Sequence, residues 1–276
     1  MNPPKPIIVD DLFPPVLSAL LELLSGLSSD DWNRPTCCPG WTVKDIAAHL
    51  LGGEIGILSR KRDGHSFSGS PIMQWDKLVE LINDLNKTWV TAASRLSPRV
   101  LTDLLKITGE QVCDYFKSLD PYAIGGPVDW ASQEPAPVWL DLAREYTERW
   151  HHQQQIRDAV GKPGLKEPKF FAPLLDTFVR ALPRTYREVE ANEGTLVALT
   201  ISGDSGGRWG LLREEGAWGL YVDPSQPSDA EVIIDQDASW RLFTRGIGKD
   251  EALNKAKLIG DHSLGMKMFE TVSVIA

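Results

Sequence analysis

The spacing of apolar residues changes its period once along the chain, and this change limits the folds that the chain can adopt. Up to about residue 161, apolar residues recur every three or four positions, as in Leu17, Leu20 and Leu24, which is typical of amphipathic helices. From about residue 194, short alternating segments lie between Gly-, Asp- and Pro-rich turns, namely TLVALTIS, GRWGLLRE, AWGLYV and AEVIID. Such segments are typical of strands, so a helical part precedes a part that contains a sheet.

Helix-capping and helix-terminating residues indicate where these elements begin and end. Thr42 and Asp45 form a capping-box pattern at the start of a helix, and Gly161 followed by Pro163 ends another. We expect helices over 13–27, 42–62, 73–96, 98–118, 139–161, 169–190, 238–244 and 262–274, with loops at 28–41 and 120–137. The strands are expected to form a small antiparallel sheet. The sequence therefore predicts an α+β protein with a helical domain over 1–164 and an α+β domain over 165–276.

Composition excludes several classes of protein and partner. With 42% hydrophobic and 24% charged residues among 276, the chain matches a globular protein with a sizeable core. A net charge of −9 argues against a nucleic-acid partner or an anionic membrane surface. Three cysteines, Cys37, Cys38 and Cys113, cannot form a disulfide framework. The chain has neither a secretory leader pattern nor an apolar run of roughly 18 residues, so we expect a cytoplasmic protein.

Three residues have the types and spacing of a metal site. Glu148 and His152 are four apart and share one face of a predicted helix, whereas Tyr146 and Trp150 point to the opposite side. His49 lies on another predicted helix. Two histidines and one carboxylate suit a borderline divalent ion such as zinc and leave a coordination position open, as in catalytic sites. The spacing by itself favours an exposed helix pair and an unrelated histidine, and the adjacent His151 leaves the choice of histidine open.

Two segments carry a resemblance to a known family. The residues TCCPGWTVKDIAAHL at 36–50, taken with ERWHHQQQIRDAVG at 148–161, resemble the mycothiol-dependent maleylpyruvate isomerase family of the DinB/YfiT-like metalloenzyme superfamily. The resemblance implies a DinB-like four-helix bundle that binds a divalent metal, usually zinc, through His49, Glu148 and His152, with His151 as a neighbour that is not a ligand. The segments 229–246 and 257–276 resemble the C-terminal domain of the family, which is similar to sterol-carrier folds.

The resemblance also implies a chemistry. An ion with an open position can bind a low-molecular-weight thiol such as mycothiol, lower its pKa and present a thiolate nucleophile. Members of the superfamily use such thiolates for cis/trans isomerisation or for thiol transfer. We therefore expect an isomerase or S-transferase that acts on a small anionic or electrophilic substrate. Two alternatives stay open, namely a hydrolase that uses metal-bound water and a non-catalytic protein that binds an apolar ligand in its C-terminal domain.

Several further residues invite a catalytic or a structural interpretation. Arg157 and Arg245 are candidates for binding an anionic substrate or cofactor, although Arg157 equally suits a structural ion pair. Asp45 either orients His49 or only caps its helix, and the cap is favoured because Thr42 completes that pattern. Cys37 and Cys38 are expected to be unreactive, because no activating base lies near them in sequence.

Overall fold

The computed structural model describes residues 1–65 and 75–274, and its fold is α+β, as predicted. Contacts divide the described chain into two compact units. The helical unit comprises Val9–Asp120 and Glu148–Leu165, and the sheet unit comprises Met1–Ile8, Pro121–Thr147 and Lys166–Val274. One helix, α6 (Val138–Val160), contributes its first part to the sheet unit and its second part to the helical unit. The division of the chain into continuous domains at residues 164 and 165 stays a prediction.

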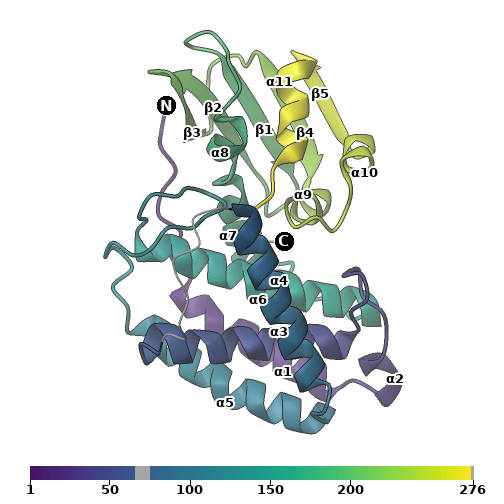
Figure 1. Cartoon of the computed structure of the whole chain (residues 1–276). Coiled ribbons are helices and arrows are strands. Elements are labelled where there is room, and N and C mark those ends of the chain that lie inside the picture. The colour runs from purple at the N-terminus through teal and green to yellow at the C-terminus, as the bar shows by residue number, and fades with distance from the viewer. Residues whose placement is uncertain (66–74, 275–276) are drawn as a thin grey trace. The chain divides into compact units, whose positions relative to one another are not determined.

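The helical unit is built from the amphipathic segments that the sequence indicated (Figure 1). Besides the second part of α6, its elements are η1 (Asp10–Leu12), α1 (Phe13–Ser25), α2 (Ser29–Trp32), α3 (Val43–Gly56), the π-helix η2 (Ile57–Arg62), α4 (Trp75–Ala93) and α5 (Pro98–Lys117). Helix α3 packs against α4 and α5, and α1 packs against α5. Helix α2 interrupts the predicted loop 28–41, because Ser28 and Asp31 form a capping box. The predicted helix start at Met73 lies outside the described residues.

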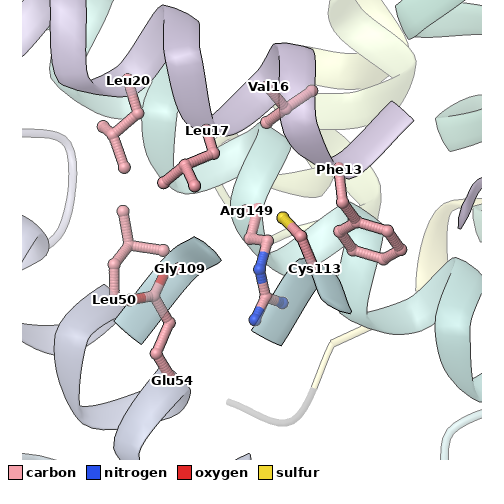
Figure 2. A pocket seen from close by; sticks show the side chains of 9 residues that line it. All are labelled: Phe13, Val16, Leu17, Leu20, Leu50, Glu54, Gly109, Cys113 and Arg149. Carbon is pink, nitrogen blue, oxygen red and sulfur yellow. The ribbon is translucent and has the colours of Figure 1, made fainter. Parts of the chain in front are cut away.

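A small cavity interrupts the packing of the helical unit (Figure 2). It has space for about one water molecule. Its walls are mostly apolar but include one acidic and one basic side chain; they comprise Phe13, Val16, Leu17, Leu20, Leu50, Glu54, Gly109, Cys113 and Arg149. The cavity therefore places one carboxyl group and one guanidinium group inside the helical unit.

A glycine lets α4 approach the helix that carries His49. The indole Nε1 of Trp89 donates a hydrogen bond to the carbonyl oxygen of Ala48 at 2.7 Å. A Cβ atom at Gly52, one turn further along α3, would lie 2.6 Å from the Trp89 ring. No side chain fits at that distance, so Gly52 is required for this contact. The neighbouring Gly53 faces open space, since a Cβ atom there would meet no neighbouring atom within 4 Å.

We expect opposite effects from the two glycine-to-alanine substitutions. Gly52→Ala displaces Trp89 and should lower the free energy of unfolding by about 1–2 kcal/mol, because overpacking outweighs the gain in helix propensity. Gly53→Ala should raise it by up to about 1 kcal/mol, because alanine favours the helix and meets no obstacle. Urea unfolding of both variants measures the difference. Equal effects would contradict the assigned contact between Trp89 and α3.

The sheet unit contains a five-stranded sheet and short helices. In chain order its elements after α6 are α7 (Pro168–Val179), α8 (Leu182–Tyr186), β1 (Leu196–Ser202), β2 (Gly207–Glu214), β3 (Ala217–Val222), β4 (Ala230–Asp235), α9 (Gln236–Phe243), α10 (Lys249–Asn254), β5 (Ala256–Gly260), α11 (His262–Lys267) and η3 (Met268–Glu270). The strand order is β3-β2-β1-β4-β5. Large side chains such as Phe178, Tyr186, Trp240 and Phe243 are fully buried in this unit.

In this unit the sheet and two predicted helices differ from the structure. The predicted helix 262–274 is shorter, because α11 ends at Lys267 and η3 covers only Met268–Glu270. The sheet is mixed and not purely antiparallel, because β4 returns beside β1 in the same direction, with Val197 opposite Ala230. Side chains alternate with the same period in parallel and antiparallel strands, so alternation cannot encode the direction of pairing. The predicted helix 169–190 is divided into α7 and α8, since the ring of Pro183 is incompatible with a continuous helix through Val179. Within the described residues, none of the helices has the length and apolar composition that a membrane crossing needs.

Candidate metal centre

The start of α3 is held by its own side chains, and this sets where His49 lies. The Thr42 hydroxyl accepts from the Asp45 backbone N–H, and the Asp45 carboxylate accepts from the Thr42 N–H at 2.9 Å. These bonds confirm the predicted capping box and account for the Asp45 carboxylate without His49. Two turns into α3, the His49 ring lies between Trp41, at a centroid distance of 5.3 Å, and His152, at 4.6 Å.

Helix α6 presents the other two candidate ligands from one face. Glu148 and His152 are separated by one turn, and the His152 Nε2 lies 3.4 Å from the Glu148 Oε2. Trp150 is fully buried, and its indole Nε1 donates to the Leu165 carbonyl oxygen at 2.8 Å. The aromatic side chain between the two ligands is thus anchored in the core, which fixes the direction in which the polar face points.

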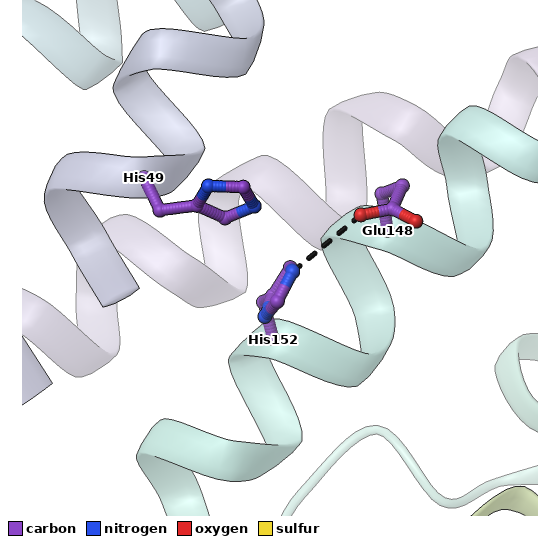
Figure 3. Close-up of side chains that lie close together, drawn as sticks. All are labelled: His49, Glu148 and His152. Carbon is purple, nitrogen blue, oxygen red and sulfur yellow. Dashed lines mark ion pairs between the residues drawn. The ribbon is translucent and has the colours of Figure 1, made fainter. Parts of the chain in front are cut away.

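The three predicted ligands come together in the helical unit (Figure 3). One donor atom from each of His49, Glu148 and His152 lies within 4.8 Å of the others. Two ligands of a tetrahedral zinc ion at 2.0–2.2 Å are themselves about 3.4 Å apart. The Nε2–Oε2 separation of 3.4 Å already matches this spacing. The donor atom of His49 lies within 4.8 Å of the other two and needs to approach them by at most about 1.4 Å. The donor set and its convergence therefore fit a divalent ion.

His49 is held in the form that a metal ion requires. Its pKa is lowered to about 4, first by burial and then by the nearby His152, against the opposing effects of Glu148 and of a hydrogen bond with Asn86. A ligand histidine must be neutral. With this pKa, His49 carries no proton to displace at neutral pH.

Gln155 orients His152 and was not identified from the sequence. Its Oε1 lies 2.7 Å from the His152 Nδ1. An amide oxygen only accepts, so Nδ1 donates and Nε2 is the ring nitrogen that faces Glu148. Nε2 is therefore the nitrogen of His152 that could bind a metal ion together with Glu148. The available signal was the amide three residues after His152, one turn along the same helix face.

The remaining candidates are placed differently. The Arg157 guanidinium donates to the carbonyl oxygens of Lys162 at 3.2 Å and Ala19 at 3.3 Å, which supports a structural role within the helical unit. Arg245 is exposed, has a positive φ of 59° and belongs to the sheet unit, so its role toward the cluster stays a prediction. A hydrogen bond with Cys37 and burial raise the pKa of Cys38, which agrees with an unreactive thiol.

Comparisons with solved structures support the fold. A mycothiol-dependent maleylpyruvate isomerase aligns with a TM-score of 0.53 and 14% identity over 86% of this chain and 88% of that one. A histidine-to-alanine variant of a protein of that description aligns with a TM-score of 0.55 and 12% identity over 90% of each chain. The sterol carrier protein domain 2 of Helicoverpa armigera matches at a TM-score of 0.29, which carries no argument, so the sterol-carrier likeness stays a prediction.

A family model decides the relationship. A search of curated proteins found no match. In contrast, the model described as the mycothiol maleylpyruvate isomerase N-terminal domain matches residues 13–157, which is more than half of the chain. This span contains all three candidate ligands and both segments of the resemblance, apart from the last four residues of the second. The chain therefore belongs to the mycothiol maleylpyruvate isomerase N-terminal domain family.

Proposed function

We propose that the protein is a divalent-metal-dependent enzyme that activates a low-molecular-weight thiol, such as mycothiol, for isomerisation of a small anionic or electrophilic substrate or for thiol transfer to it. The observation that carries this proposal is the convergence of His49, Glu148 and His152 to within 4.8 Å. The family name supports the choice of thiol and of a maleylpyruvate-like substrate. Zinc is the expected ion, because two histidines and a carboxylate form a donor set that suits it.

The chain's own residues provide the conditions for this chemistry. A bound divalent ion lowers the pKa of a coordinating thiol, so that the thiolate forms near neutral pH. Three protein ligands leave a position for that thiol. Gln155 holds the proton of His152 on Nδ1 and keeps Nε2 directed at the cluster. The Trp41 ring packs against the His49 ring at a centroid distance of 5.3 Å.

We expect turnover to require both a metal ion and a thiol. Protein purified without added metal is analysed for its metal content and then assayed with maleylpyruvate and with a model electrophile. Each assay is run with mycothiol, bacillithiol, glutathione or no thiol. The proposal predicts about one divalent ion per chain and activity only when a thiol is present.

Two results would contradict the proposal in different ways. A protein that is purified metal-free and cannot be loaded with zinc, nickel or manganese has no functional metal centre. Metal-dependent turnover that is equally fast without any thiol would instead favour the hydrolase, in which water takes the open position.

A further inference from the structure

A buried carboxyl group links the two helices that carry the candidate ligands. Glu54 lies on α3, five residues after His49, and is only 4% exposed. Its carboxyl group lines the cavity of Figure 2 together with Arg149, which directly follows Glu148 on α6. The cavity thus brings together one ionisable group from each ligand-bearing helix.

Each of the two groups is fixed by further contacts. The Arg149 guanidinium lies over the rings of Phe13 and Phe116, at 5.5 Å and 5.3 Å from their centroids. The Glu54 Oε2 is hydrogen-bonded to the Thr108 hydroxyl on α5. A Cβ atom at Gly109 would lie 3.1 Å from the Glu54 Oε1, so this glycine leaves room for the carboxyl group.

Burial and the neighbouring groups shift the pKa of Glu54 in opposite directions. Burial raises the pKa of Glu54 to about 7, against the opposing effects of Arg149 and of the Thr108 hydrogen bond. The Thr108 hydroxyl also donates to the Leu104 carbonyl oxygen at 2.9 Å. Of the other cavity residues, only Cys113 is titratable.

Fold stability alone does not account for this arrangement. Replacing inward-facing charged groups by apolar side chains of similar size is often neutral or stabilising. The attraction between opposite charges on two helices does, however, favour one rotation of those helices. Turning a helix by about 10° moves an atom about 6 Å from its axis by about 1 Å, whereas metal–ligand distances tolerate about 0.2 Å.

We infer that Glu54 and Arg149 are positioning residues for the metal centre: their attraction across the cavity sets the rotation of α3 and α6 at which His49 meets Glu148 and His152. This inference rests on the proposed metal-dependent function. It predicts that removing the pair weakens metal binding without weakening the fold.

The test compares metal affinity and fold stability in the full-length chain. The wild type, the double variant Glu54→Met/Arg149→Met and the single variant Glu54→Gln are titrated with Zn²⁺ against a chelator. The absorption spectrum of bound Co²⁺ reports the ligand geometry, and urea unfolding of the metal-free proteins reports stability. Glu110→Gln is the matched control, since Glu110 is an exposed carboxyl group on α5 next to Gly109.

We expect the Zn²⁺ Kd of the double variant to rise roughly tenfold or more, as for other groups that orient metal ligands. Its Co²⁺ spectrum should change, whereas its free energy of unfolding should equal or exceed that of the wild type. Glu54→Gln keeps a hydrogen bond to Thr108 but loses the charge. Its Zn²⁺ Kd should therefore also rise above the wild-type value, by a smaller factor than in the double variant. This single variant tests the inference independently of whether the double variant folds. Glu110→Gln should match the wild type.

Three outcomes would overturn the inference. A Kd and a Co²⁺ spectrum that stay unchanged in both variants would mean that Glu54 and Arg149 only fill the core. A rise in Kd that is matched by an equal loss in the free energy of unfolding would also contradict the inference, because metal binding would then weaken only because the folded state is less stable. A wild type that binds no metal would overturn the proposed function as well, which distinguishes the two failures.

Discussion

Replacing His152 by alanine is expected to weaken metal binding strongly and to remove activity while leaving the protein folded. The His152 Nε2 lies 3.4 Å from the Glu148 Oε2, at the spacing of two ligands on one zinc ion. A zinc site contributes about 10–16 kcal/mol shared among its ligands, so the loss of one ligand should raise the Kd by roughly 100-fold or more. Metal analysis and a competitive Zn²⁺ titration of the purified variant measure this effect.

The adjacent histidine provides the matched control. His151 is also buried, and its ring centroid lies 4.0 Å from that of His152, but its nitrogen atoms are not part of the cluster. His151→Gln should retain the metal, with any loss limited to stability. Glu148→Gln, which keeps the size of the side chain and removes its charge, should behave like His152→Ala. If His151→Gln lost the metal and His152→Ala retained it, His151 and not His152 would be the ligand.

Of the substitutions described, replacing Trp150 by alanine is expected to cause the largest loss in the free energy of unfolding. The side chain is fully buried and its indole donates to the Leu165 carbonyl oxygen at 2.8 Å. Truncating a buried tryptophan costs about 3–5 kcal/mol, which is a large part of the 5–15 kcal/mol typical of a folded domain. Urea unfolding of the metal-free variant, monitored by circular dichroism, measures the change.

Trp150→Ala should also weaken metal binding, because Trp150 lies between Glu148 and His152 in the sequence of α6. Trp150→Phe retains most of the apolar volume but leaves the Leu165 carbonyl without its donor. The free energy of unfolding should therefore fall by a smaller amount, about 1–3 kcal/mol. A near-wild-type stability of Trp150→Ala would show that this face of α6 does not anchor the helix.

The sequence by itself determined those features that depend on neighbouring residues along the chain. The positions of α1, α3, α5 and α6 follow from apolar periodicity, and the start of α3 follows from Thr42 and Asp45. The shared face of Glu148 and His152 follows from helix geometry. These features are local because each depends on one element's own backbone. Even the misjudged helix 169–190 contained its local signal, Pro183.

Only the tertiary structure decided which faces of different elements meet. Periodicity defines the polar face of a helix but not its rotation against a second helix, so spacing could not choose between His151 and His152 as the partner of His49. The parallel pairing of β1 with β4 was undetermined for the same reason. The burial of Glu54 beside Arg149 depends on α1, α3, α5 and α6 closing around one cavity. Contacts between residues distant in the chain are set by packing, which no single segment encodes.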